Sequence, residues 1–353
     1  MIYFDNAATT PLCTAARERL LQDYANPSSP HILGLESERA LKGAAKDMAQ
    51  MLSCHSDELI FTSGGTESNN IGILGAALAL QSARGNRNRL HIMAGRQEHP
   101  SVLEPLAYLS SLPGFSIGHE MQEDTAMICI SQVSSETGDI FKVQKPPGVL
   151  LFVDGAQAFC KIPHQPQADI YTFSGHKFHG PMGVGGLMIK RGLRIAPLTY
   201  GGGQQSGRRP GTENVPGILA MVAAAKEMQA ADIPKILNIK NIMSSLAEEV
   251  PETHINQATD FSSPFILNMS FLGIKGETLT NMLSSEGLCV SMGTACRSAK
   301  KETGLSAAGF SKERAESAIR MSFSIMNTVE EAGIAKDLIK SCVAKLRSTG
   351  RRK

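Results

Sequence analysis

The sequence contains no tryptophan and few other aromatic residues, which together make up 5% of the chain. Its net charge is also small, because 35 Lys and Arg residues are offset by 33 Asp and Glu residues. A balanced charge disfavours a surface that coats nucleic acid, and the basic stretch at residues 347–353 is typical of a solvated tail. The longest apolar runs, such as Gly148–Val153 and Ile218–Ala225, fall well short of the ~20 residues that a membrane-spanning helix needs. We therefore expect neither nucleic acid nor a membrane as a partner.

The seven cysteines are scattered and include no Cys-x-x-Cys pair. This spacing predicts neither a disulfide framework nor a metal site. The segment Met1–Asp5 lacks a basic region followed by an apolar one, so we expect no secretory signal and a cytoplasmic location. In a reducing compartment most cysteines are small buried apolar residues, and Cys296 stands out because its surroundings in the sequence are polar.

The length of 353 residues suits about two domains. In the first part of the chain, short apolar runs alternate with stretches of helical spacing, and continuous apolar runs fit strands that are buried on both faces. This alternation predicts an α/β domain with a mostly parallel sheet flanked by helices, in which ligands bind beyond the carboxyl ends of the strands. We predict strands at residues 58–62, 90–94, 126–131, 149–154, 170–173 and 186–189, with helices at 66–84 and 100–112.

After about residue 231 the pattern changes to that of a smaller α+β domain. Helices and strands here are less regularly alternated, and a polar loop rich in Gly, Ser and Lys interrupts them. We predict helices at residues 236–250, 276–286 and 328–346, strands at 265–270, 288–291 and 319–323, and the polar loop at 293–309.

Polar side chains stand where two of the predicted strands end. Asp154 ends one strand, and Lys177 follows the next. Alone, Asp154 is well explained as a helix N-cap. A lysine just beyond an apolar strand is partly desolvated, however, which favours its neutral, nucleophilic form and suits imine formation. These are the two groups that pyridoxal phosphate requires, since the carboxylate keeps the ring nitrogen protonated and the lysine carries the aldehyde.

A phosphate site is predicted where Phe61–Ser68 runs from a strand through two glycines into a helix. Backbone N–H groups and the positive end of the helix dipole converge at such a point. Ser174 and His176 would add side-chain donors. The alternative is a plain strand-to-helix turn with Thr66 as the N-cap. The glycine-rich loop at residues 200–212 lacks the ending of a P-loop and is expected to offer backbone and Arg donors to an anion.

Together these segments resemble the cysteine desulfurases of the NifS and IscS type, which are class V pyridoxal phosphate enzymes of fold type I. The resemblance extends over essentially the whole chain and rests on the joint order of its motifs. It implies a large cofactor-binding domain at residues 13–231 and a small domain at residues 1–12 and 232–353 that carries the cysteine loop. The matching motifs are Tyr3–Pro11, Asn26–Ser29, Phe61–Asn70, Glu98–His99, Asp154–Gln157, Ser174–Pro181, Gly211–Asn214, Gly293–Cys296 and Ile319–Ser322.

The resemblance implies a role for each matching residue. Lys177 is similar to the lysine that carries the cofactor, Cys296 to the nucleophile that takes the sulfur, and His99 to the imidazole stacked on the cofactor ring. Arg320 resembles the clamp on the substrate carboxylate, and Asn6 a second substrate-binding residue. The implied cofactor contacts are Gly65, Thr66, His99, Ser135, Asp154, Gln157, Ser174, His176, Lys177 and, from the other subunit of a homodimer, Thr212.

For three of these residues a simpler interpretation stays open. His99 would also suit a satisfied histidine at a helix start, Arg320 a surface ion pair, and Cys296 an inert surface thiol. Ser135 departs from the family pattern, since it stands where an asparagine contacts the ring oxygen.

The implied activity is removal of sulfur from L-cysteine to give L-alanine and a persulfide on Cys296. The persulfide would pass to a scaffold or carrier protein that assembles iron–sulfur clusters or a thio-cofactor. Two alternatives remain: a related class V enzyme, such as a selenocysteine or cysteine sulfinate lyase or an aminotransferase, and a sulfur-relay scaffold without enzymatic activity.

Overall fold

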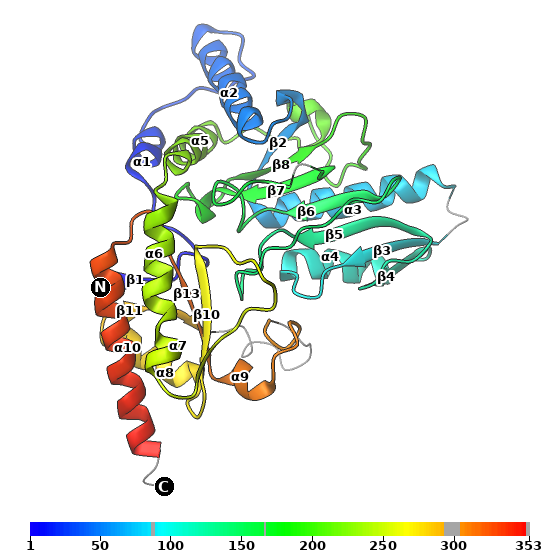
Figure 1. The fold of residues 1–353 in the computed structure, drawn as a ribbon. Helices are drawn as coiled ribbons and strands as arrows, with labels where there is room; N and C mark the ends of the chain where they lie inside the picture. Colours follow the sequence, from blue (N-terminus) through cyan, green and yellow to red (C-terminus); the bar gives the residue numbers. More distant parts are fainter. Residues whose placement is uncertain (86–88, 166, 293–303, 351–353) are drawn as a thin grey trace. The chain divides into compact units, whose positions relative to one another are not determined.

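The computed structural model describes residues 1–85, 89–165, 167–292 and 304–350, and the chain divides into two compact units (Figure 1). The terminal unit comprises residues 1–10, 133–140 and 231–353, and the sheet unit comprises residues 11–132 and 141–230. Residues 133–140 thus belong to the terminal unit although they interrupt the sequence of the sheet unit. Each unit is described by itself below.

The sheet unit is built on a seven-stranded sheet with the order β2-β8-β7-β6-β5-β3-β4. The strands β7, β6, β5, β3 and β4 are parallel neighbours, whereas β8 is antiparallel to both β7 and β2. The predicted mostly parallel α/β sheet is therefore confirmed, with β8 as the exception. The strands are β2 (Leu59–Thr62), β3 (Leu90–Ala94), β4 (Phe115–Gly118), β5 (Thr125–Ser131), β6 (Leu150–Asp154), β7 (Ile170–Ser174) and β8 (Gly185–Ile189).

Burial explains why these strands form. Every residue of β6 and β7 is buried, as expected for central strands covered on both faces. The helices α3 (Gly65–Ala83) and α4 (Pro100–Ser110) pack against the sheet and each other, and α3 places Ile73 and Ala76 in a core with Ile92 and Phe152. A second group of helices packs together through α5 (Val215–Gln229), which contacts α1 (Thr14–Leu20) and α2 (Ile32–Met51).

The terminal unit contains a four-stranded antiparallel sheet, β12-β13-β10-β9, and a separate parallel pair, β1-β11. The predicted strand at residues 288–291 is split at Val290, because its first half pairs with β1 and its second half with β13. The strands are β1 (Ile2–Tyr3), β9 (Thr253–Ile255), β10 (Ile266–Phe271), β11 (Leu288–Cys289), β12 (Ser291–Met292) and β13 (Ala318–Ser322).

The helices of the terminal unit pack around α10 (Val329–Gly350), which contacts α6 (Ile233–Ser244) and α8 (Gly276–Ser285). The single helix predicted at residues 236–250 is two helices, because α7 (Leu246–Glu249) follows α6 after Ser245. A short helix, α9 (Lys312–Glu316), precedes β13. Within the described parts of the chain, no helix has both the length and the apolar character that crossing a bilayer requires.

Candidate cofactor and substrate sites

The sheet unit brings most of the predicted cofactor residues to one edge of its sheet. Asp154 ends β6 and Ser174 ends the adjacent parallel strand β7. Strand β2 runs in the same direction as β7, because both are antiparallel to β8. In register, Ser174 lies opposite Gly185, and Gly185 lies opposite Thr62. The carboxyl ends of β2, β6 and β7 therefore meet at the same edge, where ligands of such sheets bind.

The predicted phosphate site is compact because three glycines without side chains, Gly64, Gly65 and Gly185, lie close together there. We call these three residues the glycine cradle. A Cβ atom added to Gly185 would lie 2.7 Å from Cα of Gly64, and one added to Gly65 would lie 3.5 Å from Cβ of Ser174. Gly64 has a φ of 151°, which other residues rarely adopt. Helix α3 begins at Gly65 with Gly64 as an N-cap that has no side chain to cap it, so the alternative of Thr66 as N-cap is wrong. The start of α3 is thus open to an anion beside the Ser174 hydroxyl.

His176 and Lys177 follow Ser174 in a short 3-10 turn, η2 (Gly175–Lys177), and both are partly buried. Burial, with the nearby ammonium groups of Lys177 and Lys161 as smaller contributions, lowers the pKa of His176 to about 4. The imidazole is therefore neutral at physiological pH. Two cations close to a neutral ring, at the edge that holds the glycine cradle, favour an anionic ligand.

Asp154 is a buried carboxylate with neutral partners. Its Oδ1 accepts the N–H of Ala156 at 2.8 Å, and its Oδ2 accepts the amide of Asn69 at 2.8 Å. Across the part of the chain that the structure describes, no Lys, Arg or His forms an ion pair with it. A buried carboxylate is stable when a cation completes its surroundings, and a protonated pyridine nitrogen is such a cation. This donor set fits pyridoxal phosphate.

His99 is the N-cap of α4, and its Nδ1 accepts the backbone N–H of Ser101 at 3.1 Å. The same Nδ1 lies 2.7 Å from the Ser101 hydroxyl. The interpretation of His99 as a satisfied histidine at a helix start therefore describes its Nδ1 correctly. Because capping uses only that nitrogen, it leaves a role for the ring face unaffected, and stacking on a cofactor stays a prediction.

Gln157 is buried in the turn after β6, whereas Thr212 is exposed. Thr212 lies at an open pocket of about 380 Å³ in the sheet unit. The same pocket is lined by Glu67 and Arg209, which form an ion pair at 3.0 Å. An exposed position agrees with the prediction that Thr212 serves another subunit and does not test it.

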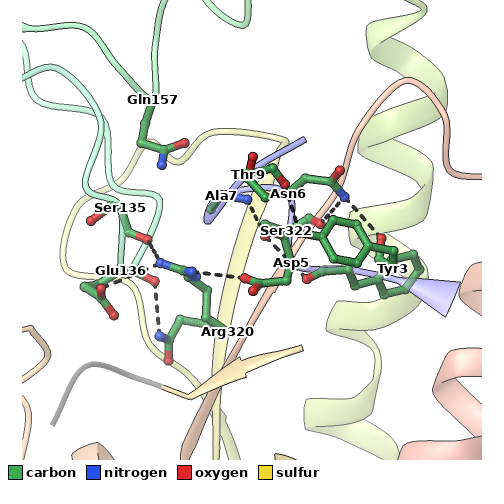
Figure 2. Close-up of polar contacts among 12 residues, drawn as sticks. Tyr3, Asp5, Asn6, Ala7, Thr9, Ser135, Glu136, Gln157, Arg320 and Ser322 are labelled. Atoms are coloured by element: carbon green, nitrogen blue, oxygen red, sulfur yellow. Dashed lines mark hydrogen bonds and ion pairs between the residues drawn. The ribbon is translucent and has the colours of Figure 1, made fainter. Parts of the chain in front are cut away.

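Arg320 lies on β13 in the terminal unit, and its guanidinium is held from several sides (Figure 2). Nη1 donates to the carbonyl oxygen of Ser135 at 2.8 Å and Nη2 to Oδ1 of Asp5 at 3.1 Å. A Glu136 carboxylate oxygen lies 3.7 Å from Nη1. Arg320 is only 7% exposed, so the alternative of a surface ion pair is wrong. Among the described residues its buried Nε has no hydrogen-bond partner, which marks a donor suited to an oxygen ligand.

Asn6 and Ser135, also predicted site residues, lie in the terminal unit. The amide nitrogen of Asn6 donates to the carbonyl of Ser322 at 2.9 Å and to that of Tyr3 at 3.1 Å, and so ties the N-terminal segment to β13 (Figure 2). Its Oδ1 is buried and has no hydrogen-bond partner in the part of the chain that the structure describes. Ser135 contacts Arg320 through its backbone carbonyl.

The remaining predicted site residue, Cys296, lies outside the described residues. Other residues that contact these side chains were not predicted from the sequence. Asp5 and Glu136 contact Arg320 from distant parts of the chain, and Asn69 contacts Asp154. Asn69 and Asp5 do lie within motifs that carry the family resemblance, but a motif does not show which of its residues meet.

The chain is similar to known proteins over almost its full length. Residues 2–333 match the family model described as Aminotransferase class-V. A cysteine desulfurase IscS of Dictyoglomus turgidum is 33% identical, with 98% of this chain and 95% of the relative covered. A solved NifS-like protein superposes with a TM-score of 0.86 at 32% identity, covering 98% of this chain and 99% of the other. The structure of SspA in complex with cysteine gives a TM-score of 0.77 at 25% identity, covering 92% and 99%.

Proposed function

This chain belongs to the class-V aminotransferase family, and from that premise we propose that it is a cysteine desulfurase that converts L-cysteine to L-alanine and a protein-bound persulfide. The observation that carries the proposal is the placement of a buried carboxylate, Asp154, as the last residue of β6, while Lys177 follows the end of the adjacent parallel strand β7. The glycine cradle supports it, since it lies at the same edge of the sheet.

Pyridoxal phosphate, when bound, supplies an electron-withdrawing ring that acidifies the Cα proton of an amino acid. We assign Lys177 as the residue that carries it and Asp154 as the partner of its ring nitrogen. Gln157 would donate to the phenolic oxygen, and His99 would stack on the ring. The remaining proposed contacts are Gly65, Thr66, Ser174 and His176 to the phosphate, Thr212 to the phosphate of a second copy in a homodimer, and Ser135 to the ring oxygen.

The chain's own residues perform the steps on the substrate. Arg320 binds the carboxylate of L-cysteine through parallel N–H donors, with Asn6 as a second contact. Lys177 removes the Cα proton and holds it on Nζ, and His99 assists the proton movements at the substrate thiol. The Cys296 thiolate then attacks the substrate sulfur. The sulfur–sulfur bond forms as the carbon–sulfur bond breaks, the electron pair stays with the carbon fragment, and protonation of that fragment gives L-alanine.

The persulfide on Cys296 is the product that a sulfur-accepting scaffold or carrier protein would take, for iron–sulfur cluster or thio-cofactor assembly. We propose that this takes place in the cytoplasm, because the chemistry depends on free thiols and a reducing compartment maintains them.

The test is L-alanine formation from L-cysteine by the purified full-length chain after addition of pyridoxal phosphate. We expect Cys296→Ser to bind the cofactor, seen as yellow absorbance. It should form no persulfide, and its rate of alanine formation should be far below that of the wild type. Cys289→Ser is the matched control, because Cys289 is a partly exposed free thiol in the same unit, and it should turn over normally.

Two outcomes would contradict the proposal. Alanine or sulfide release that survives Cys296→Ser would favour a related lyase or an aminotransferase. A chain that acquires no absorbance from added pyridoxal phosphate would favour a sulfur-relay scaffold without enzymatic activity.

A further inference from the structure

Asn69, on α3, stands at the centre of a buried hydrogen-bond network in the sheet unit. Its amide nitrogen donates to Asp154 Oδ2 at 2.8 Å and to the hydroxyl of Ser101 at 2.8 Å. Its carbonyl oxygen accepts the hydroxyl of Thr172 at 2.7 Å. Asn69 is 1% exposed and Thr172 is fully buried. The network therefore joins the proposed partner of the cofactor ring nitrogen to the Ser101 hydroxyl, which in turn lies 2.7 Å from His99.

The chemistry of its neighbours fixes the orientation of the Asn69 amide. An ionised carboxylate can only accept hydrogen bonds, so the NH₂ group must face Asp154. The carbonyl oxygen then faces Thr172, whose hydroxyl can donate to it. Both amide hydrogens and the carbonyl are satisfied in this orientation, whereas the flipped amide would place an oxygen against a carboxylate. A fully satisfied buried network is rigid.

This orientation determines which way the Ser101 hydroxyl points. Since the Asn69 nitrogen is only a donor, the Ser101 oxygen must accept from it, and its own proton is directed to Nδ1 of His99. The backbone N–H of Ser101 also donates to Nδ1, at 3.1 Å. A nitrogen that accepts from two donors carries no proton. The proton of the neutral imidazole is therefore on Nε2.

We propose that Asn69 is a positioning residue that sets the Asp154 carboxylate and, through Ser101, the tautomer and ring plane of His99. The catalytic consequence rests on the proposed function: His99 meets the substrate and the cofactor ring as a neutral imidazole with a hydrogen-bond donor at Nε2. The Asn69 side chain thus fixes the orientation of the Asp154 carboxylate relative to that of the His99 ring.

The tautomer is measured by ¹⁵N NMR of the full chain labelled at histidine, before and after addition of pyridoxal phosphate, with His99→Gln used to assign the His99 signals. In the wild type we expect Nε2 to be protonated and Nδ1 unprotonated. Asn69→Ala and Ser101→Ala each remove a link of the network and, of the two Ser101 donors to Nδ1, leave only the backbone N–H held in place. The tautomer protonated at Nδ1 should therefore become measurable beside the one protonated at Nε2. Ser101→Thr, which keeps the hydroxyl, should restore the wild-type signals.

The second measurement is cofactor affinity, followed by the absorbance of bound pyridoxal phosphate. Asn69→Ala should weaken binding about tenfold, because Asp154 loses a charged hydrogen bond. Asn70→Ala is the matched control: Asn70 is the next residue of α3, is partly exposed, and donates to the backbone carbonyl of Thr66. It should bind as the wild type does. Should Asn69→Ala not fold, the Ser101 pair still tests the tautomer.

The proposal is overturned if the His99 signals of Ser101→Ala are those of the wild type, or if Asn69→Ala binds the cofactor as tightly as Asn70→Ala. Failure of the proposed function can be distinguished from failure of this proposal by comparing the His99 tautomer with alanine formation. A chain whose His99 tautomer shifts as expected but which makes no alanine from cysteine retains the network and lacks the activity. A chain that makes alanine with an unchanged tautomer in every variant has the activity and lacks the positioning.

Discussion

The ammonium of Lys161 lies 3.2 Å from Oε1 of Gln157, and both side chains are buried. Since an ammonium group only donates, it fixes the carbonyl end of the Gln157 amide toward itself. The NH₂ end of Gln157 is directed elsewhere, which is what a donor to a phenolic oxygen requires. The charge of Lys161 also reaches His176, whose pKa it helps to lower.

Lys161→Met should therefore weaken the binding of pyridoxal phosphate by about tenfold, because the Gln157 amide loses the partner that orients it. The same substitution should raise the pKa of His176 from its value of about 4, since one of the two nearby cations is removed while burial remains. Absorbance titration measures the first effect and NMR titration the second. Lys226→Met removes an exposed lysine of the same unit that pairs with Asp47, and should change neither. Unchanged affinity in Lys161→Met would contradict the orienting role.

Arg320→Lys should raise KM for L-cysteine more than tenfold and lower kcat less, because an ammonium group cannot make two parallel hydrogen bonds to a carboxylate. Cofactor absorbance should be unchanged, since Arg320 is not among the proposed cofactor contacts. Steady-state kinetics of alanine formation measure both constants. Arg314→Lys is the control, because Arg314 lies in the same unit and contacts Asn256. A KM equal to that of the wild type would remove Arg320 from the proposed substrate site.

Thr212→Ala should lower cofactor retention on dilution, because we propose that its hydroxyl reaches the phosphate of a second copy. The rate of absorbance loss, together with the molar mass from light scattering, measures this effect. Thr199→Ala is the matched control, since Thr199 is exposed and lines the same pocket. A wild-type chain that is fully active as a monomer would contradict the shared site.

The sequence was a good guide to strands that are buried along their whole length. Runs such as Leu150–Asp154 and Ile170–Ser174 are apolar because both faces are covered, so composition alone locates them. It did not give the reversed direction of β8, because strand direction is decided by the partners that a strand meets. The break at Val290 was missed for the same reason, since its two sides join different sheets.

Among the site residues too, those marked by their local sequence were predicted, whereas those defined by their partners in the fold were not. Asp154 and Lys177 were found because strand ends are visible as a change from apolar to polar residues. The partners Asp5 of Arg320 and Asn69 of Asp154 are 315 and 85 positions away along the chain. Only the folded structure shows that such residues meet.

The Glu98 side chain is buried inside the sheet unit. It is a fully buried carboxyl group that accepts the backbone N–H of Ser131 at 2.9 Å and the Ser131 hydroxyl at 2.5 Å. Burial, assisted by the negative charge of Asp154 and opposed by both contacts with Ser131, raises its pKa to about 7. In an unfolded chain a glutamate titrates near pH ~4.3.

Between about pH 4.3 and the folded pKa of about 7, the folded protein holds a proton on Glu98 that the unfolded chain has lost. The free energy of unfolding must therefore fall as pH rises through this window and level off above it. Glu98→Gln has the shape of the protonated form, since its carbonyl accepts the Ser131 N–H and its NH₂ donates to the Ser131 hydroxyl. Relative to the wild type it should gain about 2 kcal/mol between about pH 5 and about pH 8.

Thermal unfolding of the two chains across this range gives the comparison, with Glu123→Gln, an exposed glutamate of the same unit, as the control. The difference between Glu98→Gln and the wild type should grow with pH because only the wild type must hold a proton on this buried side chain when it folds. A difference that stays constant from about pH 5 to about pH 8 would mean that Glu98 is already ionised at the lower end, and that burial does not govern its titration.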